Sequence, residues 1–227
     1  MSSEVTAATA SRELDLTSTG APLDLASLVP GRRDWEVVVG FGKGRYLLGR
    51  AAEEPESGFL GIERAAKYHG IARERARKRG LSNVIAVKGE ALRLFAVVLP
   101  RRFARAVHVY FPDPWPKDRH HRRRLFARGS VDLLAGLLRP GGRLFFATDH
   151  GDYGKLVTRI LDSYPPFWVR RQAGPWPEGP RTNYERKYVR EGRPILRLIA
   201  ELEEEEAPFH PEARSRVLVG YRTAGEE

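Results

Sequence analysis

The chain of 227 residues contains no cysteine. Disulfide bonds, thiolate metal sites and cysteine nucleophiles are therefore excluded, and this composition is typical of a cytoplasmic protein. Long apolar runs are also missing, because no uninterrupted stretch approaches the roughly 20 residues that a membrane-spanning helix requires. The first twenty residues lack the basic start and apolar core of a secretion signal. We therefore expect a soluble cytoplasmic protein without a membrane partner.

Acidic residues are in the minority. The chain has 29 Asp and Glu against 39 Lys and Arg, which gives a formal net charge of +10. Residues 64–79 carry seven Lys or Arg against one Glu, and residues 117–128 carry six Lys or Arg and two His against one Asp. Solvated helix faces usually mix the two signs. Two segments whose charges are almost all positive therefore favour a nucleic acid as the partner, since Lys and Arg neutralise phosphates.

Strand patterns alternate with helix patterns through most of the chain. Short apolar runs predict strands, and they are separated by helical segments that end at glycine or proline. The predicted strands cover residues 35–40, 58–63, 83–89, 105–111 and 142–149, with a late strand within 190–201. One helix is predicted after the first strand and its glycine turn. The other predicted helices cover residues 64–79, 91–99, 119–138 and 153–163. This alternation predicts an α/β fold with a mostly parallel sheet and helices on both faces.

Three regions differ in composition. Residues 1–30 lack periodicity and are expected to form a flexible N-terminal arm. Residues 31–200 hold the alternating elements and are predicted to form one domain. Residues 201–227 begin with an acidic run and are predicted to be a C-terminal appendage.

The positions just after the predicted strands are where ligands bind in such folds. These positions are Gly40, Glu63, Glu90, Asp113 and Asp149. Four of the five are acidic, and acids at these places also cap the helices that follow. In a basic protein, acids after neighbouring strands favour a shared pocket over capping alone.

A glycine turn, GFGKG, spans Gly40 to Gly44 after the first strand. Glycine permits a positive φ and the close approach of a ligand to the backbone. A phosphate-binding P-loop is excluded because Lys43 is followed by Gly44 instead of Ser or Thr. Glu63 stands where an acid accepts hydrogen bonds from ribose hydroxyls, and Glu90 stands near the place of an adenine amino group. These features favour S-adenosylmethionine as the cofactor, with NAD as the alternative.

Three prolines surround Asp113 in YFPDPWPK, residues 110–117. Proline fixes its own φ and disfavours helical angles in the residue before it, so this stretch is expected to be stiff and extended. The stretch GPWPEGPR, residues 174–181, is expected to be a loop that acts as a lid over the pocket.

Five segments together carry a resemblance to a known family. They are GFGKG, FLGIE, YFPDPWPKDRHHRRR, FATDHGDY and TNYERKY, in order between about Gly40 and Leu198. With them the chain resembles the bacterial tRNA (guanine-N7)-methyltransferase family of the TrmB type. The resemblance implies a Rossmann-like S-adenosylmethionine-dependent methyltransferase fold with a mostly parallel seven-stranded sheet. It also implies methyl transfer to N7 of a variable-loop guanosine of tRNA, position 46, without a metal.

The resemblance implies roles for individual residues. Asp113 is expected to be the catalytic carboxylate. The expected cofactor-binding positions are Val38, Gly40, Gly42, Glu63, Glu90 and Asp113. The expected substrate-binding residues are Lys117, Asp149, Thr182, Asn183, Tyr184 and Glu185. Arg122, Arg123 and Arg124 are expected to reach the RNA backbone from one helix.

Two positions depart from the family pattern. Glu90 replaces the aspartate that is more usual at the end of the third strand, and the second, more serious departure lies before the glycine turn. The family carries a glutamate two residues before the first glycine of the turn, and Val38 stands there in this chain. Glu36 lies on the same strand face, one pleat or about 7 Å earlier. The alternative hypothesis is therefore a basic RNA-binding homologue of the same fold with weakened or lost cofactor binding. The sequence leaves open whether the protein is a monomer or a homodimer.

Overall fold

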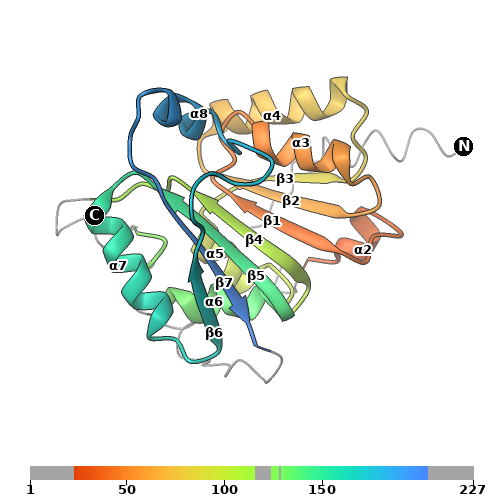
Figure 1. Ribbon diagram of the computed structural model, residues 1–227. Coiled ribbons are helices and arrows are strands. Elements are labelled where there is room, and N and C mark those ends of the chain that lie inside the picture. Colours follow the sequence, from red (N-terminus) through yellow and green to blue (C-terminus); the bar gives the residue numbers. More distant parts are fainter. Residues whose placement is uncertain (1–22, 116–123, 128, 204–227) are drawn as a thin grey trace, which may run out of the picture.

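Seven strands form one sheet in the order β3-β2-β1-β4-β5-β7-β6 (Figure 1). The computed structural model describes residues 23–115, 124–127 and 129–203. Three predicted site residues, Lys117, Arg122 and Arg123, therefore lie outside the described residues, as do most of the predicted N-terminal arm and C-terminal appendage. The strands are β1 Trp35–Val39, β2 Gly58–Glu63, β3 Val84–Lys88, β4 Ala104–Tyr110, β5 Leu138–Thr148, β6 Phe167–Arg171 and β7 Leu196–Leu202. The helices are α2 Leu25–Leu28, α3 Arg45–Glu53, α4 Ala66–Lys78, α5 Ala91–Val97, α6 Ser130–Leu137, α7 Gly151–Asp162 and α8 Asn183–Arg190.

Strand direction distinguishes this sheet from the simplest doubly wound fold. Neighbours from β3 to β5 pair in parallel, whereas β7 pairs antiparallel with both β5 and β6. The common doubly wound order is 3-2-1-4-5-6. Here a seventh strand lies between the fifth and the sixth. The prediction of a mostly parallel seven-stranded sheet with helices on both faces is confirmed.

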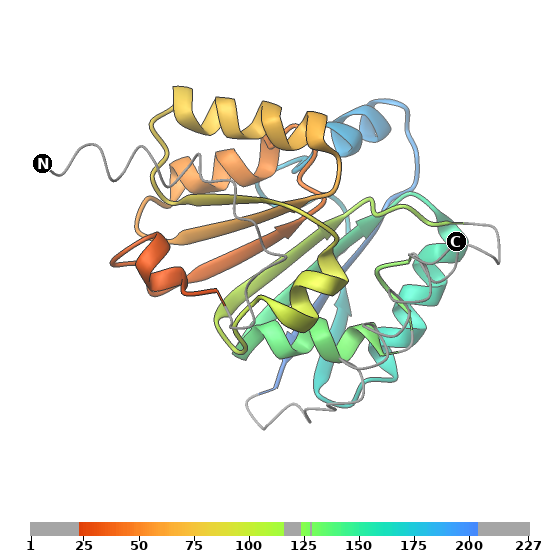
Figure 2. The same cartoon turned by 180° about the vertical axis from the view of Figure 1, so that it is seen from behind.

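Helices cover both faces of the sheet because successive strand residues point in opposite directions. On β1, Val38 packs into a cluster with Leu47 of α3 and Ala72 of α4, whereas Val37 packs into the larger cluster beneath α5, α6 and α7. Figure 2 shows this second face, with α5, α6 and α7 in yellow-green, green and teal in front of the sheet. The first four β1 residues are buried on both sides of the sheet, as expected for a central parallel strand.

The helix predicted over residues 119–138 is confirmed over Ser130–Leu137 and is wrong at residues 124–127 and at Leu138. Residues 124–127 are not helical, and α6 begins only at Ser130. Gly129 stands before it with φ 92°, a left-handed conformation that interrupts a helix. Phe126 is fully buried and packs edge-on against Phe146 of β5. Burial of this ring fixes the segment before the helix as a turn against the sheet.

Buried residues lie just outside the predicted domain of residues 31–200 at both of its ends. Residues 23–29 belong to the fold, because Leu25 of α2 and Val29 are buried in the larger core cluster. At the other end, β7 extends to Leu202, which is also buried. The edge strand β6 was not predicted, since its five residues include two arginines and its Trp168 is 55% exposed. Within the described part of the chain, no helix is both long and apolar enough to cross a membrane.

Candidate functional site

The strand order brings the five predicted ligand positions to one edge of the sheet. The loops after β3, β2, β1, β4 and β5 are consecutive along this edge. They carry, in that spatial order, Glu90, Glu63, the turn that begins at Gly40, Asp113 and Asp149. We call this row the carboxyl edge. Positions that are distant in the sequence are therefore neighbours in the fold.

The glycine turn leaves one side of its backbone open. Gly40 has φ 67° and Gly42 has φ 55°, and a Cβ placed on either residue would meet no atom within 4 Å. The N–H of Gly42 donates to Oε2 of Glu63 at 2.8 Å, which joins the turn to the end of β2. This open, glycine-only surface has the form that a ligand in contact with the backbone requires. It fits the adenosylmethionine-type cofactor that the sequence predicts.

Glu63 keeps hydrogen-bonding capacity for such a ligand. Its Oε1 accepts from the N–H of Ala65 at 2.9 Å, so each carboxylate oxygen has one backbone donor. A carboxylate oxygen can accept two hydrogen bonds, and each oxygen thus retains one lone pair. The carboxylate is buried at the sheet edge, where ribose hydroxyls could use those lone pairs.

Glu90 and Asp149 have local partners. Glu90 is the N-cap of α5, and its Oε2 accepts from the N–H of Arg93 at 2.9 Å. Of the two roles expected for the acids after the strands, Glu90 therefore has the capping role. Its Oε1 takes no part in the cap. Asp149 lies 3.4 Å from the guanidinium of Arg193. Among the described residues, no three His, Asp or Glu side chains gather to form a candidate metal site.

The loop that carries Asp113 is constrained by its backbone conformation and by Arg124, in addition to its prolines. Asp113 is exposed, and the residues Phe111 and Trp115 around it have left-handed φ values of 52° and 41°. The expectation of an extended stretch is therefore wrong at both residues. Arg124 donates from Nε to the carbonyl of Pro114 at 2.7 Å and from a terminal nitrogen to that of Trp115 at 3.0 Å. Two donors of Arg124, which was expected to reach RNA, thus bind this loop.

A cleft of about 1110 Å³ lies beside the carboxyl edge, between the glycine turn, α3, α4 and α8. Three predicted cofactor positions and three predicted substrate positions line it, namely Val38, Gly40, Gly42, Thr182, Asn183 and Tyr184. Glu63, Glu90, Asp113 and Asp149 do not line it. The cleft thus joins the glycine turn to α8, while the acids stand along the edge outside it.

Glu185 differs from the expectation of direct substrate contact. Its side chain is fully buried, and its Oε1 accepts a hydrogen bond from Nε of Arg197 of β7 at 2.8 Å and forms an ion pair with a terminal nitrogen of the same guanidinium, also at 2.8 Å. Its Oε2 accepts from the N–H of Arg181, and its own N–H donates to Thr182 Oγ1 at 3.0 Å. Thr182 thus caps the start of α8, as the first residue of a capping box does, while the Glu185 carboxylate binds the N–H of the residue before the cap. Thr182 and Glu185 therefore fix α8, and Asn183 and Tyr184 are left exposed beside the cleft.

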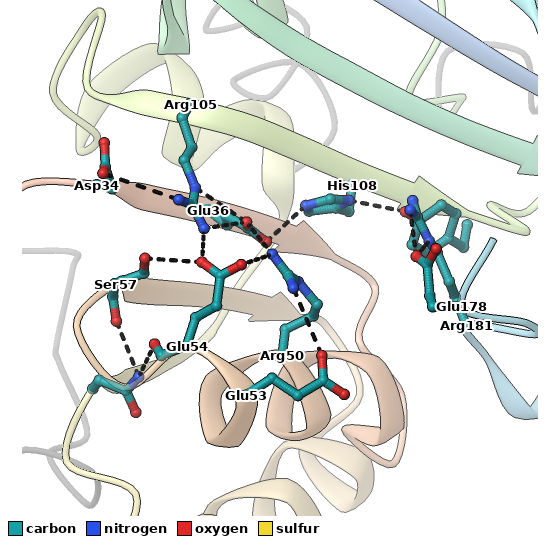
Figure 3. Close-up of polar contacts among 12 residues, drawn as sticks. Asp34, Glu36, Arg50, Glu53, Glu54, Ser57, Arg105, His108, Glu178 and Arg181 are labelled. Carbon is teal, nitrogen blue, oxygen red and sulfur yellow. Dashed lines mark hydrogen bonds and ion pairs between the residues drawn. The ribbon is translucent and has the colours of Figure 1, made fainter. Parts of the chain in front are cut away.

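Glu36 does not replace the acid missing at Val38. Its side chain is 4% exposed, and its Oε1 accepts from Arg50 at 2.9 Å and from Arg105 at 2.8 Å. Its Oε2 lies 3.1 Å from Nε2 of His108 (Figure 3). Both oxygens are therefore occupied inside the protein. Val38 is buried on the floor of the cleft and presents only methyl groups there.

A buried chain of hydrogen bonds leads from Glu36 to the segment before α8. An ionised carboxylate only accepts, so His108 donates from Nε2 to Glu36 and accepts at Nδ1 from the Tyr110 hydroxyl, 2.9 Å away. Tyr110 in turn accepts from the guanidinium of Arg181. Burial lowers the pKa of His108 and outweighs the opposing effect of Glu36. Burial raises the pKa of Glu36, but hydrogen bonds from His108 and Arg50 hold it well below its usual range.

Arg181 lies among four aromatic rings. Its guanidinium carbon is 4.0 Å from the ring centre of Trp176, 4.8 Å from that of Phe145, 5.3 Å from that of Tyr46 and 5.6 Å from that of Tyr110. Trp176 itself is 2% exposed. The segment that was expected to be a lid is therefore docked on the sheet. The sequence does not reveal this arrangement, because the rings come from four separate parts of the chain.

Comparison with known proteins identifies the family. Residues 34–198 match the family model described as "Putative methyltransferase". The tRNA (guanine-N(7)-)-methyltransferase of Nitrosococcus oceani is 35% identical over 177 residues, which cover 78% of this chain and 75% of the relative. That of Alkalilimnicola ehrlichii is 36% identical over 188 residues, 82% of this chain and 79% of the relative. The chain belongs to the tRNA (guanine-N7)-methyltransferase family.

Solved structures show the fold that this tRNA (guanine-N7)-methyltransferase family member adopts. The antibiotic-resistance methyltransferase Kmr has a TM-score of 0.55 at 20% identity, over 81% of this chain and 93% of that protein. A SAM-dependent methyltransferase from Aquifex aeolicus has a TM-score of 0.52 at 15% identity, over 75% and 83% of the two chains. The fold is therefore the Rossmann-like fold of SAM-dependent methyltransferases, as the sequence predicted.

Proposed function

We propose that this protein is a tRNA (guanine-N7)-methyltransferase that methylates N7 of the variable-loop guanosine at position 46, with S-adenosylmethionine as the donor. The observation that carries the proposal is the adjacency of β1 and β4, which sets the open glycine turn beside the loop of Asp113. The names of the relatives and their coverage of this chain support the same activity. The cysteine-free composition is consistent with action on tRNA in the cytoplasm.

The cofactor would be held by three loops of the carboxyl edge. Gly40 and Gly42 offer an open backbone, Glu63 offers acceptors to ribose hydroxyls, and Glu90 lies in the next loop on the adenine side. When bound, the cofactor supplies a methyl group on a positively charged sulfur. Val38 adds no charge for it, so we assign the affinity to the glycine turn and Glu63.

Asp113 has the properties that the methylation of guanine N7 demands. N7 already carries a lone pair, so no side chain has to remove a proton from the attacking atom. The guanine ring gains positive charge during the reaction, and a fixed carboxylate nearby stabilises this charge. Asp113 is also able to accept hydrogen bonds from the N–H groups of the guanine base-pairing edge. The hydrogen bonds from Arg124 hold the backbone that follows Asp113, and orientation alone can contribute several kcal/mol to such a transfer.

The substrate RNA would be held by residues around this edge. Asn183 and Tyr184 are exposed at the start of α8, and Asp149 follows β5. Lys117, Arg122 and Arg123 belong to the same proposed surface through their place in the sequence. Thr182 and Glu185 contribute by fixing the position of α8.

Mass spectrometry of tRNA nucleosides tests the proposal. Unmodified tRNA is incubated with the full chain and methyl-labelled S-adenosylmethionine and then digested to nucleosides. We expect label in 7-methylguanosine, and we expect none with a tRNA in which another base replaces guanosine 46. Label in a different nucleoside, or no label with active cofactor and intact tRNA, would overturn the proposed function.

A further inference from the structure

The helix α4 has two cationic faces that differ in their partners. On the outward face, Arg77 and Lys78 both pair with Glu74, at 2.9 and 3.5 Å. On the other face, Tyr68 and Arg75 lie seven residues apart, the C-cap residue Arg79 follows four residues later, and all three line the cleft. Residues at such intervals share one face of a helix. The basic segment of residues 64–79 therefore has two surfaces. One mixes positive and negative charges, and the other, Tyr68, Arg75 and Arg79, carries positive charges only, and we call it the cationic stripe.

The cleft gathers cations from several elements. Seven Lys and Arg line it, against two acids, Glu53 and Glu178. Each of these acids already pairs with a cation of the cleft, Glu53 with Arg50 at 3.6 Å and Glu178 with Arg181 at 2.5 Å. The remaining cations are Lys43, Arg45, Arg75, Arg79 and Lys187.

Four of these cations have no acidic partner in the described part of the chain: Lys43, Arg45, Arg75 and Arg79. All four are exposed. Positive charges that line a concave site reinforce one another's electric field and attract an anion more strongly than scattered surface charges do. The cleft therefore has the electrostatics of a site for a polyanion.

The cationic stripe is continuous with the carboxyl edge. Arg75 donates to the backbone carbonyl of Lys43 in the glycine turn at 2.9 Å, so α4 touches the turn directly. Tyr110 at the end of β4 and Phe111 after it line the cleft, three and two residues before Asp113. Across the cleft, Tyr184 of α8 is 54% exposed. A strand of RNA with its target base near Asp113 would have its neighbouring phosphates within this cleft.

We propose that this cleft binds the sugar-phosphate backbone of tRNA beside the target guanosine. Lys43, Arg45, Arg75 and Arg79 contact phosphates, and Tyr184 offers a ring face for stacking, a combination common in single-strand sites. This inference rests on the proposed function. The cofactor does not explain the cluster, because S-adenosylmethionine has no phosphate and carries a positive sulfonium.

A pair of matched double variants tests the cleft. Arg45→Gln/Arg79→Gln removes two charges from the cleft and leaves Arg75 bound to the glycine turn. Arg77→Gln/Lys78→Gln removes two charges from the outward face of the same helix. Binding of fluorescently labelled tRNA is measured by anisotropy across a range of salt concentrations. We expect the cleft variant to bind tRNA about tenfold or more weakly at low salt. We also expect its plot of log K against log salt to be less steep, with a slope smaller in magnitude by about two. We expect the control variant to keep the wild-type slope.

Two further readouts separate the possible outcomes. S-adenosylmethionine affinity, measured by calorimetry, should be equal in all three proteins, and methylation by the cleft variant should show a raised KM for tRNA with a nearly unchanged kcat. If the wild type makes 7-methylguanosine but both variants bind tRNA with equal affinity and slope, the cleft is not a phosphate site and the proposed function stands. Failure of the wild type to methylate tRNA would overturn the proposed function, and the salt slopes would still decide whether the cleft binds RNA.

Discussion

Asp113 is an exposed acid held in a loop of unfavourable backbone geometry. The left-handed φ values of Phe111 and Trp115 cost about 1–2 kcal/mol each for residues with a side chain. The hydrogen bonds from Arg124 to the next two carbonyls keep the loop in this form. The stability of the fold gains nothing from exposure of the carboxylate. We therefore attribute the arrangement to the chemistry at the carboxyl edge.

Asp113→Asn should separate catalysis from folding. It removes the charge that faces the developing cation, so we expect kcat for tRNA methylation to fall about 10²–10³-fold. Because the side chain is exposed, the melting temperature should stay unchanged and tRNA should still bind. The measurement is single-turnover methylation together with thermal unfolding.

Asp152→Asn is the matched control, since Asp152 is an exposed acid on the neighbouring helix α7, with 88% of its side chain accessible. Its kcat should equal that of the wild type. An Asp113→Asn enzyme with wild-type kcat would remove Asp113 from the reaction.

At the scale of elements, α8 is fixed to the sheet by one buried ion pair. Glu185 binds Arg197 of β7, and both side chains are less than a tenth exposed, at 0% and 7%. The removal of one partner from a buried pair leaves the other charge uncompensated. The position of Tyr184 beside the cleft therefore depends on a contact made on the opposite side of its helix.

Glu185→Gln should destabilise the protein by about 3 kcal/mol, because Arg197 loses its only buried counter-charge among the described residues. Urea unfolding measures this loss. Glu191→Gln, at the exposed end of the same helix, should cost less than about 1 kcal/mol. Equal stability of the two variants would show that the pair does not hold α8.

The buried pair between β1 and β4 gives the protein a predictable response to acid. The pKa of His108 lies below its ordinary value of 6.5 in the fold, so its contribution to stability is complete above pH 6.5 and is lost as the pH falls below it. The pKa of Glu36 lies below its ordinary value of 4.5, so its contribution is lost below pH 4.5. Acidification therefore lowers the stability of the fold through both His108 and Glu36.

We therefore expect the free energy of unfolding to decrease from pH 6.5 downward, with a steeper decrease below pH 4.5. Urea unfolding at a series of pH values measures it. His108→Gln removes the imidazole and should flatten the curve between pH 6.5 and 4.5 while the lower part remains. Stability that rises on acidification through this range would contradict the assigned ionisation of the pair.

At the scale of the whole molecule, the sequence predicted what depends on local pattern. The alternation of short apolar runs with helical segments was sufficient for the parallel sheet, and it placed Gly40, Glu63 and Asp113 at strand ends. Contacts between distant segments could not be predicted. Glu36 pairs with a histidine 72 residues away, and the rings around Arg181 come from four parts of the chain.

Some patterns have two physical meanings, and the sequence does not separate them. Thr182 and Glu185 match the family's substrate motif, yet the same spacing lets the Thr182 side chain cap the helix at the N–H of Glu185, and in the fold they fix α8. Likewise, Arg124 lies in a basic run typical of RNA contact, and in the fold two of its donors bind the carbonyls of Pro114 and Trp115. The burial of a side chain depends on the tertiary fold, which neither motif encodes.

The central claim is that the carboxyl edge binds S-adenosylmethionine although Val38 replaces the usual acid. Calorimetric titration of the full chain with S-adenosylmethionine tests it most directly, with Glu63→Gln as the comparison. We predict one cofactor per chain for the wild type and an affinity about tenfold or more lower for Glu63→Gln, since one charge-assisted hydrogen bond is worth about 1.5–3 kcal/mol. The absence of binding to the wild type at millimolar cofactor would contradict the account and leave an RNA-binding protein of methyltransferase fold.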